Sequence, residues 1–166
     1  MTKARKNKFS NSRKESALSS LEPLKFDTEH ESITQRCKFN FHYLNFSSPA
    51  ADFKTEKLKD LMDRLKIFSQ FSLEYWSKQK VDGTGTYLTY YESFPDPGKT
   101  DYQYPKNVPE EARWARFRIS GRFRLIGFTI PETLHGQTHT VDGYTFDKNT
   151  FYCVFIDPEH KFWLTK

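Results

Sequence analysis

The most regular hydrophobic pattern of the chain lies between Thr55 and about Lys78. Apolar residues recur there at helical spacing, and the residues are Leu58, Leu61, Met62, Leu65 and Phe68. Polar residues fill the other side, and Thr55 is a residue type that commonly caps a helix. The polar stretch Ser69–Ser72 interrupts the pattern, so the segment is expected to form one helix or two, with Ser72 capping the second.

A different pattern, with a period of two, predicts strands on both sides of this helical region. In CKFNFHYLNF, residues 37–46, aromatic residues alternate with polar ones, as in a half-buried strand. FYCVFI, residues 151–156, is a short apolar strand that is expected to be central in a sheet. KFWLTK, residues 161–166, is expected to close the chain as another strand. Residues 87–110, with their prolines, and 131–149 are expected to be loops, the second with a small strand near Tyr144.

The stretch RFRISGRFRLIGF, residues 116–128, has the pattern of a β-hairpin that is unusually rich in arginine. A three-residue loop ending at Gly121 would pair Phe117 with Phe123 on one face. The other face would then pair Arg118 with Arg122 and Arg116 with Arg124. Like charges placed directly opposite each other weaken a hairpin, so such a face is expected to meet something negatively charged.

The order of these segments predicts an α+β domain, with an N-terminal strand and one or two helices packed on one face of a small antiparallel sheet. The arginine face would be the free one. Residues 1–36 are polar and begin with a basic run, and we interpret them as a flexible tail; the alternative is an arm that touches nucleic acid. Residues 37–166 are expected to form the single folded domain.

Composition adds a preference for anionic partners and favours the cytoplasm as the compartment. The net charge is +5, and 17% of the residues are aromatic. Cys37 and Cys153 have neither metal-site nor disulfide-framework spacing, and they are expected to be reduced thiols, with one disulfide as the alternative. The N-terminus lacks an apolar signal region, and no segment has the length and apolarity of a membrane span.

Several kinds of site are not indicated by the sequence. VDGTGTY, residues 81–87, lacks the strand and helix that a phosphate-cradling loop needs on its two sides. His135 and His139 lie in a Gly/Thr-rich loop without a third metal ligand at a fitting spacing. No segment resembles a serine nucleophile elbow, and neither cysteine has an evident activating partner. We therefore expect no metal and no cofactor.

The basic and aromatic residues that remain suit RNA. A planar guanidinium donates two parallel hydrogen bonds to phosphate, which favours Arg116, Arg118, Arg122 and Arg124 as phosphate ligands. His160 can carry a proton near neutral pH, and a ring such as Trp163 or Tyr152 can stack on an unpaired base. The structural alternative is that these arginines pair with carboxylates nearby in the sequence, namely Asp96, Asp101, Glu110 and Glu111, while His160 caps a turn and Trp163 belongs to the core.

The C-terminal part of the chain resembles RelE-like toxins, the ribonuclease partners of bacterial toxin–antitoxin pairs. The block FRISGRFRLIGF contains an arginine, a turn with glycine, an aromatic residue, a second arginine and an apolar run, with Arg122 as an extra residue. FYCVFIDPEHKFW then supplies an apolar strand, a turn and a closing aromatic residue. The resemblance implies a RelE-like fold and an endoribonuclease in which Arg124 and Arg118 hold the scissile phosphate. It also implies that His160 transfers a proton, that Lys161 supports the phosphate, and that Trp163 lies near the closing tyrosine of the family.

Two functions follow from these observations. The first is a toxin-like, metal-independent endoribonuclease, with RNA, including ribosome-bound mRNA, as substrate and an antitoxin protein as a further partner. The second is a non-catalytic module of the phage or mobile-element type that binds nucleic acid or an acidic protein through the same basic face. A third alternative is a structural subunit of a larger assembly.

Overall fold

The computed structural model describes residues 35–45, 55–81, 83 and 85–164. The predicted tail, residues 1–36, lies outside these residues except for Gln35 and Arg36. Within the described part, Gln35 is joined to the domain, because its carbonyl accepts a hydrogen bond from the Asn149 side chain at 2.7 Å.

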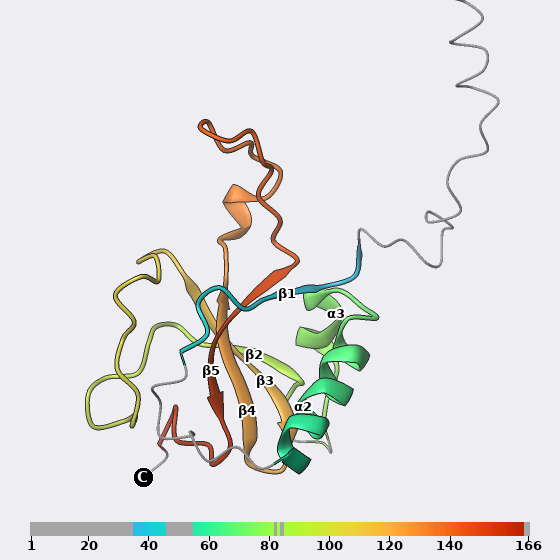
Figure 1. Ribbon diagram of the computed structural model, residues 1–166, viewed down its shortest axis with the longest axis vertical. Helices are drawn as coiled ribbons and strands as arrows, with labels where there is room; N and C mark the ends of the chain where they lie inside the picture. Colours follow the sequence, from blue (N-terminus) through green and yellow to red (C-terminus); the bar gives the residue numbers. More distant parts are fainter. Residues whose placement is uncertain (1–34, 46–54, 82, 84, 165–166) are drawn as a thin grey trace, which may run out of the picture. The chain divides into compact units, whose positions relative to one another are not determined.

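The described elements form a five-stranded sheet with two helices (Figure 1). The strands are β1 (Lys38–Asn40), β2 (Leu88–Tyr90), β3 (Arg113–Ser120), β4 (Phe123–Thr129) and β5 (Thr150–Asp157). Their order in the sheet is β1-β5-β4-β3-β2; β1 and β5 are parallel, and the other neighbours are antiparallel. The expected α+β class is confirmed, but the sheet is mixed and not antiparallel as predicted, because β1 runs parallel to β5. The RelE-like form of the fold stays a prediction.

The helical region is divided in two, as the polar interruption indicated. Helix α2 spans Thr55–Phe68 and α3 spans Leu73–Lys78. The Ser72 hydroxyl caps α3 by accepting a hydrogen bond from the Tyr75 N–H at 3.1 Å, which confirms the predicted cap. Phe68 at the end of α2 stacks on Phe117 of β3 with ring centroids 4.5 Å apart. The helices therefore cover one face of the sheet (Figure 1).

The opposite face of the sheet is also covered, so the expectation of a free arginine face is wrong. The loop between β2 and β3, residues 91–112, lies over this face and contributes Tyr102 and Val108 to a second hydrophobic core (Figure 1). Trp114 stands in the middle of that core and stacks on Phe162, which follows β5, with centroids 5.8 Å apart. Large rings let a loop without regular structure bury a strand face, because each ring removes much apolar surface from water.

Three strand predictions need correction. Strand β2 lies inside the segment predicted to be a loop, and it is paired with β3 from Leu88 to Tyr90. The described part of KFWLTK, residues 161–164, is not a strand but an irregular segment that packs on the second core. Around Tyr144 there is only an isolated bridge between Thr138 and Thr145.

A β-bulge between Ile126 and Gly127 changes which side chains of β5 share a face. Strict alternation along β5 would place Phe155 on the same side as Phe151 and Cys153. Phe151 and Cys153 do lie in the helix-side core, but Phe155 packs in the second core. A bulge shifts the alternation of side chains by one residue, which accounts for the difference.

The two cysteines are free and buried. Burial raises the pKa of the Cys37 thiol to about 12 and that of Cys153 above its ordinary value as well. Both thiols are thus protonated at neutral pH and belong to the core. Among the helices of the described residues, none has the length and apolarity needed to cross a membrane.

Candidate functional site

The arginine hairpin has a different register from the predicted one. Phe117 lies opposite Leu125, Arg118 lies opposite Arg124, and Ser120 lies opposite Phe123, with a bulge between Arg118 and Ser120. The predicted pairs Phe117–Phe123, Arg118–Arg122 and Arg116–Arg124 are therefore wrong. The bulge lets Ile119 and Phe123 both enter the helix-side core, which gives the physical reason for this register.

The new register still gathers three arginines, Arg116, Arg118 and Arg124, on the face of the sheet opposite the helices. Arg118 and Arg124 are direct cross-strand partners, and Arg116 is two residues before Arg118 on the same strand. Arg122 is the exception, because it is exposed at the turn between β3 and β4. Gly121, with a φ of 44°, allows that turn.

The turn after β5 brings His160 to this cluster. Asp157, at the end of β5, is fully buried beside Arg124 of β4. Its carboxylate accepts hydrogen bonds from the N–H groups of Lys161 and Phe162, each at 2.9 Å. Within the turn that these bonds close, His160 adopts a φ of 61°, a left-handed conformation that costs free energy for any residue but glycine. A strained residue held by a buried carboxylate is a feature that occurs often at functional sites.

His160 is in direct contact with Arg116. The Nη1 atom of Arg116 lies 2.5 Å from Nε2 of His160. Because a guanidinium can only donate, Nε2 must accept, which places the proton of a neutral imidazole on Nδ1. Burial, followed by the charges of Arg116 and Arg124, holds the pKa of His160 below its ordinary value. His160 is therefore a neutral acceptor at neutral pH.

Arg124 is the most buried of the arginines, with only 7% of its surface exposed. Its Nη1 donates to the carbonyls of Gly121 at 2.7 Å and Phe123 at 2.8 Å. Its Nε is buried without a hydrogen-bond partner among the described residues. Burial, then the charges of Arg116 and Arg118, lower the pKa of Arg124 to about 10. The group stays cationic at neutral pH in a place where its charge is poorly solvated.

Among the described residues, the arginine cluster has one carboxylate beside it, the buried Asp157, which acts on Arg124 through its charge without a direct ion pair. None of the ion pairs there includes an arginine. Asp96 pairs with Lys99 at 3.2 Å, and Asp101 lies 4.0 Å from Lys161, so these two candidates from the loop have lysine partners. Buried or half-buried charges are normally paired, so the three arginines form an excess of positive charge that Asp157 alone does not balance.

A tyrosine that we did not select from the sequence belongs to the same site. The Tyr91 ring stacks on Trp163, with centroids 5.2 Å apart and an interplanar angle of 3°. The Arg116 guanidinium lies over the Tyr91 ring at 5.9 Å from its centroid. Burial raises the pKa of the Tyr91 hydroxyl to about 12, so it is protonated. The Tyr91 N–H donates to the Trp114 carbonyl at 2.8 Å, so Tyr91 is held in place at the end of β2. Its part in the site could be recognised only from the pairing of β2 with β3.

Two other predicted residues have different surroundings. Lys161 forms an ion pair with Glu159 at 3.1 Å and is close to Asp101, so its charge is matched. Tyr152 pairs with Phe128 near the start of β5, five residues before Asp157. At about 3.3 Å per residue, this separation along the strand is roughly 16 Å. The structure thus groups Arg116, Arg118, Arg124, His160 and Trp163, and leaves Tyr152 apart.

Comparison with known proteins found no relative of this chain. No family model, no curated protein and no solved structure matches this chain. Among the described residues, no group of histidine, cysteine, aspartate and glutamate side chains is arranged to hold a metal ion. Function must therefore be argued from the arginine–histidine site itself.

Proposed function

We propose that this site binds a phosphodiester of RNA and that the protein is a metal-independent endoribonuclease. One observation carries the proposal: among the described residues no carboxylate forms an ion pair with Arg116, Arg118 or Arg124, and three positive charges face the single buried carboxylate of Asp157 beside a neutral histidine. Arginines that are not ion-paired with carboxylates can hold a phosphate, and a neutral imidazole can accept a proton. These are the functions that RNA cleavage without a metal requires.

The contact between Arg116 and His160 suggests how RNA binding would free His160 to act as the base. A guanidinium bonds more strongly to an anionic phosphate than to a neutral imidazole, so an incoming phosphate draws Arg116 away from Nε2. Nε2 then takes the proton of the ribose 2′-hydroxyl, and the 2′-oxygen attacks phosphorus. The bond to the 5′-oxygen breaks, that oxygen takes a proton from water, and a 2′,3′-cyclic phosphate remains. The arginines stabilise the charge that develops on the phosphoryl oxygens.

The resemblance to RelE-like toxins supports the same proposal. The residues matched to the family's phosphate-binding and proton-transferring positions, Arg118, Arg124 and His160, belong to one group whose members interact electrostatically. The matched aromatic residue, Trp163, is joined to that group through Tyr91. Residues that lie near one another in space are the arrangement expected if the match is functional.

The second candidate function is binding of RNA without cleavage. The observation that favours it is the Arg116 hydrogen bond, which occupies the acceptor atom of His160. If Arg116 stays on Nε2 when RNA binds, His160 has no free lone pair for a proton. The two functions then differ in product and not in affinity.

A cleavage assay distinguishes these functions. Purified protein is incubated in EDTA with end-labelled mRNA, with and without ribosomes. Fragments that end in 2′,3′-cyclic phosphate are the expected result for the endoribonuclease. Intact RNA that is retarded on a native gel would support the binding module instead, and intact RNA without retardation would contradict both.

The arginines are expected to act on affinity through phosphate. Replacing Arg118 with alanine removes one phosphate contact, so the slope of log K against log salt concentration should decrease by about 1. Lys66→Ala is the matched control, because it removes the same charge from the exposed end of α2, on the other side of the sheet. Affinity is measured by fluorescence anisotropy with a labelled RNA between low and high salt. Equal slopes for both variants would show that Arg118 does not contact phosphate.

A further inference from the structure

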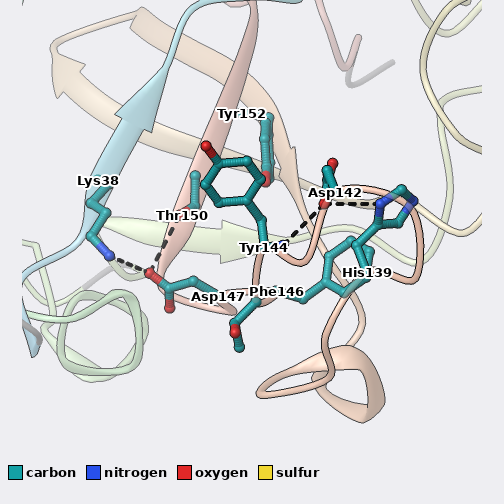
Figure 2. Close-up of a pocket in the computed structure, with 9 residues that line it drawn as sticks. Lys38, His139, Asp142, Tyr144, Phe146, Asp147, Thr150 and Tyr152 are labelled. Carbon is teal, nitrogen blue, oxygen red and sulfur yellow. Dashed lines mark hydrogen bonds and ion pairs between the residues drawn. The ribbon is translucent and has the colours of Figure 1, made fainter.

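A second candidate site lies at the other end of β5, away from the arginines. It is a pocket of about 500 Å³ between the start of β5, strand β1 and the connection from β4 to β5 (Figure 2). The residues on which the argument depends are Lys38, Asp142, Tyr144, Phe146, Asp147 and Tyr152. The proposed ribonuclease function uses none of them apart from the sequence-based expectation for Tyr152, which the structure separates from the arginine cluster.

The wall of this pocket is a well-bonded loop. The His139 N–H donates to the Tyr144 carbonyl at 2.7 Å, and the Phe146 N–H donates to the Gln137 carbonyl at 2.9 Å. The Tyr144 N–H donates to the carboxylate of Asp142 at 3.0 Å. These bonds fix Tyr144 and Asp142 beside each other, so the pocket has a defined chemical lining.

Aromatic rings approach the pocket from two parts of the chain. Tyr144 extends from the loop with 77% of its surface exposed, which is unusual for so large a ring. Tyr152 comes from β5, and one face of its ring stacks on Phe128 with centroids 5.0 Å apart. Phe146 lies below, with its ring perpendicular to that of His139 (Figure 2). The pocket therefore offers π-systems, of which Tyr144 is open to a ligand.

The charges around the pocket are mostly negative. The hydrogen bond from the Tyr144 N–H holds the pKa of Asp142 below its ordinary value. Burial raises the pKa of Asp147, but hydrogen bonds from Lys38 and from the Asn149 N–H outweigh burial and keep that pKa low. The Lys38 ammonium, 2.6 Å from Asp147, is the one lysine of the lining and matches only one of the two carboxylates. Asp142 contacts His139 at 3.0 Å, an interaction that carries full opposite charge only when His139 is protonated.

We propose that this pocket binds an organic cation, namely a guanidinium or ammonium group at the end of an alkyl chain. Such a cation would lie against the Tyr144 ring and donate to the Asp142 carboxylate. Rings attract a cation through their negative faces, and an adjacent carboxylate adds a charge-assisted hydrogen bond. A phosphate-bearing ligand is disfavoured, since Asp142 and Asp147 would repel it. The site thus has the opposite charge preference to the arginine cluster.

The test compares ligands that differ only in charge. Nα-acetylarginine amide is titrated into ¹⁵N-labelled protein, and shifts of the Tyr144 and Asp142 amide signals report binding. Nα-acetylcitrulline amide is the control, because it has nearly the same shape without the charge. Putrescine, a free diamine, is the third ligand. Tighter binding of putrescine would identify a free amine as the natural ligand. Tighter binding of the arginine derivative would identify a side chain of a partner protein as the ligand.

Variants of the lining connect any binding to the proposed contacts. Tyr144→Ala should weaken binding of the arginine derivative by about two- to tenfold, whereas Tyr144→Phe keeps the ring and should bind normally. Asp142→Asn removes the charge but keeps an oxygen that can accept the Tyr144 N–H, so the loop remains formed and affinity should still decrease severalfold. Arg118→Ala, which alters only the arginine cluster, should leave the affinity for the arginine derivative unchanged. Shifts by citrulline equal to those by arginine, or no shifts with any ligand, would overturn the proposal.

Discussion

Replacing His160 with asparagine is expected to decrease the rate of RNA cleavage by about 10²–10⁴-fold, the usual contribution of a general base. Asparagine is the matched substitution because it tolerates the left-handed backbone of residue 160, where φ is 61°. The fold, and most of the RNA affinity, should therefore persist. The rate is measured under single-turnover conditions in EDTA with saturating protein, so that binding does not limit it.

The pH dependence gives a second readout of the same role. The pKa of His160 is lowered, so its neutral form persists to a lower pH than for an ordinary histidine. Cleavage by the wild-type protein should therefore decrease only as pH falls below the ordinary histidine pKa of about 6.5, and the Asn variant should lack this acidic limb. A variant that cleaves at the wild-type rate, with the same pH profile, would exclude His160 as the base.

Replacing Gly127 with alanine is expected to destabilise the protein by about 3 kcal/mol or more, at the upper end of overpacking effects. A Cβ atom at this position would lie 2.1 Å from the Tyr152 carbonyl oxygen and 2.6 Å from the Phe151 ring. The first of these is a backbone atom of the neighbouring strand, so it cannot move without disturbing the sheet. Urea unfolding, followed by tryptophan fluorescence, gives the change in the free energy of unfolding.

Gly143→Ala is the control for this substitution. Gly143 has a φ of 74°, and an added Cβ there would have no atom within 4 Å, so alanine should cost only the conformational penalty of about 1–2 kcal/mol. If Gly127→Ala cost no more than Gly143→Ala, β4 and β5 would not approach each other as closely as described.

The sequence was most informative where structure is decided locally. The break between α2 and α3 and the cap at Ser72 depend on residues within one or two helical turns, and the sequence offered this arrangement as one of two alternatives. The three-residue β2 was missed because its pairing with β3 is formed with residues more than twenty positions away. The second core was missed for a similar reason: the proline-rich loop 91–112 has no periodic pattern, and it packs through scattered residues such as Tyr102 and Val108.

The candidate site was predicted in composition but not in detail. The clustering of Arg116, Arg118 and Arg124 followed from the alternation of side chains along β3 and β4. It persists in the observed register because the three side chains still lie on the same face of the sheet. The bulges could not be predicted, because they arise from the fit of side chains such as Ile119 into a core formed by the whole fold. Tyr91 and the Asp157 anchor depend on that same tertiary fit.

The central claim is that Arg116, Arg118 and Arg124 hold a phosphate against a neutral His160, and the imidazole itself can report on it. Long-range ¹H–¹⁵N spectra of the histidine rings at neutral pH should show a neutral His160 with its proton on Nδ1. Adding an oligodeoxynucleotide, which lacks the 2′-hydroxyl and cannot be cut, should shift the Nε2 signal as Arg116 moves to phosphate, and this shift should be much smaller in Arg118→Ala. A protonated His160, or an Nε2 signal that does not change at saturating oligonucleotide, would contradict the claim.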